Sequence, residues 1–91
     1  SYSGRALSLE QNYPNPVQGS TTISFELPEP DRVSVAVYDI SGRLVSLLAD
    51  EEFSAGRHEV QWDAQGRPAG VYLYRLETED QSLTRRLVID R

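Results

Sequence analysis

The sequence predicts an all-β domain, an immunoglobulin-like β-sandwich of about seven antiparallel strands. Short segments in which polar and apolar residues alternate recur along the chain, and turn-forming residues separate them. No segment keeps a helical spacing of apolar residues over about twelve positions. These observations place strands near residues 7–9, 21–27, 32–40, 43–49, 57–63, 70–77 and 82–90.

The length and the cysteine count limit what such a chain can be. With 91 residues it is expected to form one domain, residues 1–91, in which residues 1–8 are the end of a linker. The first ten residues hold no apolar stretch of the kind found in signal peptides, so we expect a piece of a longer protein. Zero cysteines exclude disulfides and thiolate metal sites. No membrane-spanning run of about eighteen apolar residues is present.

The charge argues against a nucleic-acid partner. The formal net charge is -5, and all nine basic residues are arginine. Because neutralising phosphates requires a basic surface, an acidic domain of this kind binds nucleic acid poorly. We therefore expect no nucleic-acid partner.

The N-terminal part combines an irregular stretch with a strand. Pro14 and Pro16 lack amide donors, so residues 9–16 are expected to be irregular. The next segment alternates strictly and directs Ile23, Phe25 and Leu27 to one side, which is typical of a strand buried on one face.

The middle of the chain has less regular patterns. Residues 32–40 carry apolar side chains on both faces, which predicts a central strand covered at least in part on two sides. Residues 39–42 form a turn in which Gly42 is free to adopt positive φ. Residues 43–49 have mixed periodicity and predict a short strand, with a helical turn as the alternative. Residues 50–56 are expected to be a charged connection.

The C-terminal half returns to clear alternation. Residues 57–63 direct His58, Val60 and Trp62 to one face, residues 64–70 are a loop, and a polar turn at 79–81 separates the last two strands. The expected core combines the inward-facing apolar residues of all long strands: Ile23, Phe25, Leu27, Val35, Val37, Val60, Trp62, Tyr72, Leu87 and Ile89.

Catalytic and metal-binding signals are weak. His58 is the only histidine, and its position on the apolar side of a strand indicates a core or rim residue. No serine stands in a nucleophile motif, so we expect no enzymatic activity. Two carboxylate groups, residues 50–52 and residues 77–80, offer oxygen ligands for calcium, but their spacing matches no calcium loop and solvated turns are preferred. We expect no metal and no cofactor.

An aromatic binding surface is a second alternative. Trp62, Tyr72 and Tyr74 could form a platform for sugar rings. Because Trp62 shares its face with Val60, packing between the sheets is the preferred interpretation.

Several segments together resemble a known family. They are Leu9–Pro16, Thr21–Pro28, Val37–Arg43, Gly56–His58 with Val60 and Trp62–Asp63, Gly70–Leu76, and Thr84–Ile89 with Arg91. In this order they resemble the C-terminal sorting domain of type IX (Por) secretion, and the similarity covers almost the whole chain. The pattern is also similar, less specifically, to the immunoglobulin-like domain of the flagellar hook-capping protein.

The resemblance implies a non-catalytic signal at the end of a larger protein of the Bacteroidetes type. In that family the outer-membrane secretion machinery reads the domain, and a sorting peptidase commonly removes it as the cargo reaches the cell surface or the medium, after passage through the periplasm. The upstream cargo would belong to the same chain. The expected recognition residues are Gly70, Tyr72, Arg85, Arg86, Leu87, Val88, Ile89 and Arg91.

The terminal strand supports this interpretation from its charge. Arg85, Arg86 and Arg91 place three of the nine basic residues among the last seven positions. They would give the machinery a positively charged surface beside a strand edge. The alternative is that these arginines pair with Glu59, Glu77 or Glu79 across the sheet. A carbohydrate-binding or structural spacer module of a secreted enzyme remains the alternative function.

Overall fold

The structure is a computed structural model that describes residues 7–90. These residues form seven strands in two antiparallel sheets, which confirms the predicted all-β sandwich. A three-stranded sheet has the order β1-β2-β5, with β1 (Ser8–Leu9), β2 (Ser20–Leu27) and β5 (Gly56–Asp63). A four-stranded sheet has the order β4-β3-β6-β7, with β3 (Asp31–Asp39), β4 (Leu44–Phe53), β6 (Gly70–Glu77) and β7 (Ser82–Ile89).

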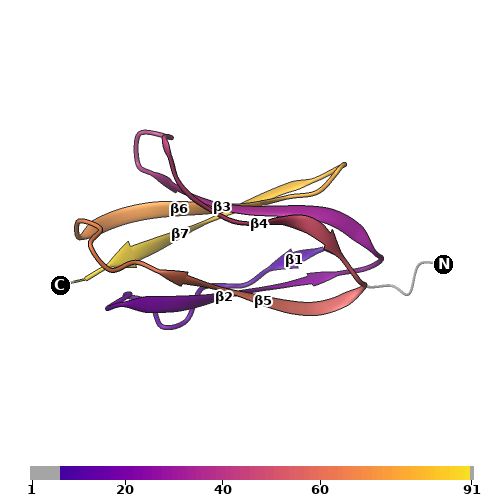
Figure 1. Ribbon diagram of the computed structural model, residues 1–91, viewed down its shortest axis with the longest axis horizontal. Helices are drawn as coiled ribbons and strands as arrows, with labels where there is room; N and C mark the ends of the chain where they lie inside the picture. Colours follow the sequence, from indigo (N-terminus) through magenta and orange to yellow (C-terminus); the bar gives the residue numbers. More distant parts are fainter. Residues whose placement is uncertain (1–6, 91) are drawn as a thin grey trace.

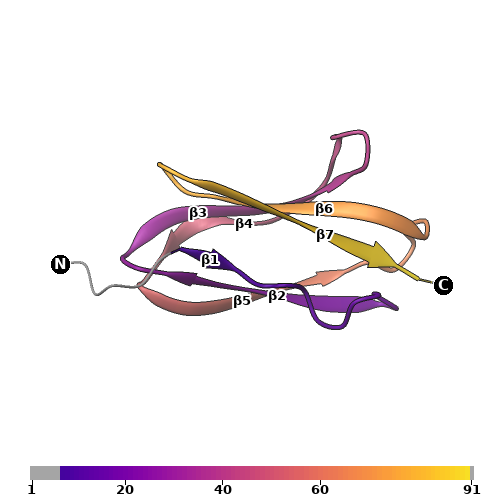
Figure 2. The same ribbon diagram turned by 180° about the vertical axis from the view of Figure 1, so that it is seen from behind.

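The two sheets lie face to face along one long axis (Figure 1). The start of β1 and the end of β7 lie towards opposite ends of that axis, as the reverse view also shows (Figure 2). Within residues 7–90, no helix is long and apolar enough to span a membrane.

The core fills the space between the sheets and follows the period of two that the sequence predicts. Of the ten expected core residues, nine are buried, and Val60 is half-buried because β5 is an edge strand. The structure adds several residues from the same inward-facing rows and from the N-terminal part: Leu9, Val17, Val33, Ala64, Tyr74 and Leu76.

The prediction of a charged connection over residues 50–56 is wrong for residues 50–53. Strand β4 continues to Phe53, and Asp50–Glu52 pair in register with β3. Phe53 holds this extension, because its ring packs edge-on against the buried ring of Phe25 at 5.3 Å between centroids. Two register shifts in the β3–β4 pairing explain the mixed periodicity and rule out the helical alternative.

Strand β3 is central, as expected, but its second face has no covering layer. Tyr38 is half-buried there, and Ile40, just after the strand, is 73% exposed. Only Ala36 is buried on this side, because the longer side chains of Leu47 and Arg75 stand next to it in register. The Asp39–Gly42 turn is confirmed, with Gly42 at φ 92°.

Residues 10–17, here called the N-terminal arm, first pair with β2 through Glu10 and Tyr13 and then reach the outer edge of β7 at Val17. The Val17 amide donates to the Val88 carbonyl at 2.7 Å, and the Asp90 amide donates to the Val17 carbonyl at 3.0 Å. Between them, the Val88 amide donates to Oδ1 of Asn15 at 3.0 Å. The arm therefore pairs with backbone groups that an edge strand would otherwise expose.

A buried hydrogen-bond network anchors the arm between the sheets. The Asn12 amide donates to the Tyr74 hydroxyl oxygen at 2.9 Å, and that hydroxyl donates to the Glu10 carbonyl at 2.6 Å. The Asn12 side chain donates to Thr21 Oγ1 at 3.0 Å and to the Pro14 carbonyl at 3.1 Å. Burial raises the pKa of Tyr74, so its hydroxyl stays protonated and able to donate. Within the described residues, no buried side-chain nitrogen or oxygen lacks a partner.

Candidate recognition surface on the terminal strand

Strand β7 is an edge strand of the four-stranded sheet, and its two faces differ. Leu87 and Ile89 point inward and are buried, whereas Arg86 and Val88 point outward and are exposed. The hydrophobic positions named from the sequence therefore divide into residues that hold the strand in place and residues that a partner can reach.

The two described arginines of β7 point in different directions. Arg85 shares the inward parity of Leu87 and reaches across to β1, where its Nε donates to the Leu9 carbonyl. Arg86 lies on the outer face, and only its backbone carbonyl is held, by Nε2 of Gln11 at 2.8 Å. The structure thus separates the two neighbours: Arg85 bridges the sheets, and Arg86 faces solvent. Arg91 lies outside the described residues.

Within residues 7–90, neither Arg85 nor Arg86 forms an ion pair with Glu59, Glu77 or Glu79, which was the alternative interpretation. There the ion pairs join Arg32 to Asp50 at 3.2 Å and Arg57 to both Glu10 and Glu59. Glu59 thus belongs to the other sheet's ion pairs. Hydrogen bonding with Arg57 lowers the pKa of the Glu10 carboxyl and keeps that pair charged.

Gly70 and Tyr72 support β7 from the neighbouring strand β6. Gly70 pairs with Ile89 and has φ 147°, a conformation that side chains rarely adopt. Tyr72 is buried opposite Leu87, and its hydroxyl donates to the Pro68 carbonyl at 2.8 Å. These two residues contact the buried side of the terminal strand and its end.

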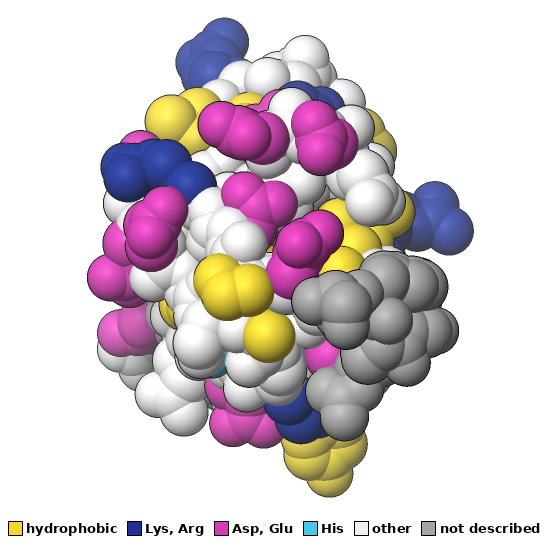
Figure 3. All heavy atoms as spheres, turned by 90° about the vertical axis from the view of Figure 1, so that its right-hand side faces the viewer, with side chains coloured by type: hydrophobic (Ala, Val, Ile, Leu, Met, Phe, Trp, Pro, Cys, Tyr) yellow, Lys and Arg dark blue, Asp and Glu magenta, His cyan; other side chains and the backbone are white. Residues whose placement is uncertain are grey.

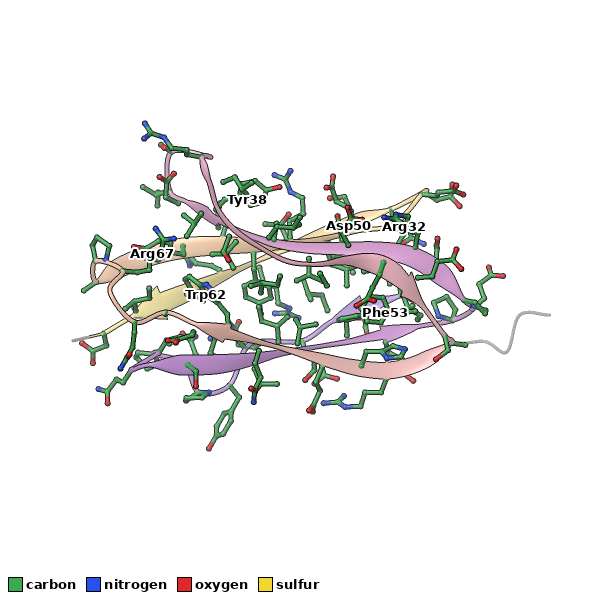
Figure 4. All side chains as sticks on the ribbon, in the orientation of Figure 1. Arg32, Tyr38, Asp50, Phe53, Trp62 and Arg67 are labelled. Carbon is green, nitrogen blue, oxygen red and sulfur yellow. The ribbon has the colours of Figure 1, made fainter. Side chains whose placement is uncertain are left out.

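The aromatic residues considered as a sugar platform are buried. Trp62 is 4% exposed and Tyr74 0%, and Trp62 meets Tyr72 edge-on with ring centroids 6.0 Å apart. Figure 4 shows Trp62 and Phe53 directed into the space between the sheets. The prediction that Trp62 fills the core is confirmed. The alternative of a sugar-binding platform is wrong, because all three rings are buried.

His58 lies at the rim of the core, as its parity predicts. Its ring packs against Phe53 at 5.0 Å and Phe25 at 5.6 Å between centroids. Nε2 lies 2.8 Å from the Ser54 carbonyl oxygen. The imidazole is therefore held by two aromatic rings and by a backbone carbonyl.

Carboxylates gather at the end of the sandwich where the β2–β3 and β6–β7 turns lie. Figure 3 looks onto this end and shows acidic side chains over much of it. Shallow hollows there are lined by Glu29, Asp31, Asp50, Glu77, Glu79 and Asp80. In residues 7–90, no three histidine or acidic side chains are grouped so that they could hold a metal ion.

Two features escaped the sequence reasoning. One is the burial of Asn12, because the nearby prolines predict an ordinary exposed loop at this position. The other is the outer face of the four-stranded sheet, where Arg75 lies 4.9 Å from the ring centroid of Tyr38. The alternation in residues 70–77 was a usable signal for the second, because Val71, Leu73 and Arg75 share the outward parity.

The fold and the terminal strand define a small immunoglobulin-like β-domain whose last strand presents an exposed arginine beside a covered edge. A family model described as a secretion system C-terminal sorting domain matches residues 11–90. The chain therefore belongs to the family of secretion system C-terminal sorting domains, and the resemblance to the type IX (Por) sorting domain is confirmed. A sorting signal of this family marks the larger chain that carries it for export to the cell surface or the medium.

Solved structures of similar fold come from two proteins of Porphyromonas gingivalis. The crystal structure of dimeric latent PorU aligns with a TM-score of 0.69 and 23% identity, over 94% of this chain and 10% of that one. A structure of PorZ, a surface component of the type IX secretion system, aligns with a TM-score of 0.61 and 24% identity, over 93% of this chain and 11% of that one. This chain thus spans about a tenth of the length of either protein. No curated protein matches it.

Proposed function

We propose that this domain directs the larger chain that carries it through the periplasm and across the outer membrane by type IX secretion. The outer-membrane machinery reads the folded domain, and a sorting peptidase then separates it from the cargo. The observation that carries the proposal is the family match, which runs from residue 11 to residue 90 and includes the whole of β7. The likeness to domains of PorU and PorZ is consistent with this role.

We assign recognition to the terminal strand and its support. Arg86 and Val88 are accessible to a partner, whereas Leu87, Ile89 and Tyr72 fix the strand from the core. Gly70 sets the start of the paired strand, and Arg85 ties β7 to β1. Arg91 is included from its charge and from the family resemblance.

Catalysis has no part in the proposed role. A sorting signal needs a stable surface that a receptor recognises, not a reactive group. The packing of His58 against Phe25 and Phe53 supports this proposal, because it gives the single histidine a structural role.

The test is export of a reporter protein fused ahead of residue 1 in a host with type IX secretion. The native fusion is expected in the medium or on the cell surface, and a fusion without the domain is expected in the periplasm. Arg86→Gln combined with Arg91→Gln is expected to shift the reporter towards the periplasm while the melting temperature stays nearly unchanged, because exposed charges contribute about 0–1 kcal/mol each.

Arg57→Gln is the matched control, since it removes an exposed arginine from the outer face of the other sheet. Equal export of the native and the double-glutamine fusions would show that these arginines are not recognised. Retention of the native fusion in the periplasm would contradict the sorting function and leave the spacer interpretation.

A further inference from the structure

The outer face of the four-stranded sheet carries an exposed apolar surface. The register aligns Leu44, Tyr38, Leu73 and Arg86 in one row across all four strands. Their neighbours along each strand point into the core, so this row faces outward. Leu44 and Leu47 are each 56% exposed on β4, which costs free energy that a partner could recover by covering them.

Two arginines border this surface. Arg75 stands in the next row and stacks over Tyr38, while Arg86 ends the first row. Within residues 7–90 neither side chain takes part in an ion pair, although Glu77 follows Arg75 on the same face. We call the surface formed by Tyr38, Leu44, Leu47, Leu73, Arg75 and Arg86 the outer patch.

The outer face of the three-stranded sheet is different. On β5 its outward residues are polar or charged, and Arg57 there is paired with Glu10 and Glu59. Both sheets bury their inner faces in the same core, so burial within the domain does not explain why exposed leucines lie on the outer face of β4 while the outer face of β5 is polar. The apolar character of the outer patch therefore indicates a contact outside the domain.

The strand edges next to the outer patch are poorly suited to adding another strand. The N-terminal arm occupies β7 from Arg86 to Asp90. On the opposite edge, β4 contains two register shifts, and Arg67 Nη2 donates to the Val45 carbonyl at 3.3 Å. Irregular and covered edges resist strand addition, so a partner must contact the face and its side chains.

We propose that the outer patch is the surface by which a protein of the secretion machinery holds this domain, and that the partner offers an apolar centre flanked by carboxylates. This inference rests on the proposed sorting function. The two leucines and Tyr38 supply apolar contact, and the unpaired arginines select a negatively charged rim. Acidic side chains line the hollows at one end of the sandwich, and within residues 7–90 no carboxylate forms an ion pair with Arg75 or Arg86.

The test uses the reporter fusion with changes in the outer patch. Leu44→Thr with Leu47→Thr is expected to lower the exported fraction about tenfold, because threonine keeps strand preference but removes apolar contact. Gln61→Thr on the outer face of the other sheet is the matched control and should leave export unchanged. Melting temperatures of all variants should agree within about 2 °C, which separates recognition from unfolding.

A charge series tests the partner's chemistry. Arg75→Lys should retain most export, and Arg75→Glu should lose about tenfold because it repels a carboxylate rim. Gln61→Glu adds a negative charge at an exposed position of the other sheet and should leave export unchanged. Equal export of Arg75→Glu and Gln61→Glu would contradict the carboxylate rim, and full export of the double threonine variant would contradict the docking surface itself.

Other occupants of the outer patch predict different results. If a second copy covers it, the chain should sediment as a dimer that the double threonine change makes monomeric. If lipid covers it, the chain should bind vesicles of phosphatidylethanolamine and phosphatidylglycerol, and the same change should abolish binding. Either result would overturn the inference while native export continued. Loss of native export would instead contradict the proposed sorting function on which the inference rests.

Discussion

The two long sides of the sandwich are closed by different chemistry. On the β1/β7 side, hydrogen bonds from the N-terminal arm and the bridge from Arg85 to Leu9 join the sheets. On the β4/β5 side, aromatic rings fill the gap, with Phe53 packed on Phe25 and His58 at one end and Trp62 on Tyr72 at the other. A short chain can thus join its sheets by hydrogen bonds on one side and by apolar packing on the other. We therefore expect mutations on the two sides to change the free energy of unfolding by different amounts.

The largest expected effect is on the aromatic side. Trp62→Ala should lower the free energy of unfolding by about 3–5 kcal/mol, since it removes a buried ring and leaves a cavity beside Tyr72. Urea denaturation measures this, and native Trp62 fluorescence should be blue-shifted and unaffected by added polysaccharide. A loss below about 1 kcal/mol would mean that the rings do not close this side.

The hydrogen-bonded side should respond next most strongly. Asn12→Ala removes the side-chain bonds to Thr21 and Pro14 in a buried place, so we expect a loss of about 2 kcal/mol. Asn15→Ala is the comparison on the exposed part of the same arm and should cost about 1 kcal/mol or less. Equal effects of the two changes would show that burial of the network does not matter.

Tyr74→Phe isolates one hydroxyl of that network. The ring stays in the core, while the bonds to the Glu10 carbonyl and the Asn12 amide are lost, which should cost about 1–2 kcal/mol. Hydrogen exchange of the Asn12 amide should become faster, because its acceptor is gone. Unchanged exchange would mean that the arm is held by its other contacts.

The smallest effect concerns the ion pair of Glu10 and Arg57. Because hydrogen bonding with Arg57 lowers the pKa of Glu10 below its ordinary value of 4.5, the stabilisation is present above that pH and is lost as pH falls through the lowered pKa. Glu10→Gln should therefore melt slightly below the native chain at neutral pH, and the difference should vanish in acid. A difference that persists in strong acid would point to packing instead.

The strictly alternating segments predicted their strands well. Residues 21–27 and 70–77 have a clear period of two, and their strands and inward residues are confirmed. The charges of residues 50–52 predict exposure, but exposure says nothing about backbone pairing, and these residues are both exposed and paired with β3 on an edge strand. The register shifts in β4 broke its period, so the pattern could not define its bounds.

The candidate site was harder to predict than the fold. The charge pattern predicts one recognition surface that contains both Arg85 and Arg86, whereas in the structure Arg85 reaches towards β1 and Arg86 faces outward. The contact of Arg85 with Leu9 joins residues far apart in the chain, and no local pattern reports such a contact. Asn12 escaped for the same reason, since its partner Tyr74 lies in β6.

The pairing of the N-terminal arm with β7 has a consequence during synthesis. The ribosome makes the arm before β7, and Val17 can pair only when Val88 and Asp90 have been added. A chain whose translation stops before residue 82 lacks the strand that covers β6 and the partner that holds the arm. The recognition surface on β7 can therefore form only after translation has passed residue 89. A domain that displays this surface has had all seven strands synthesised.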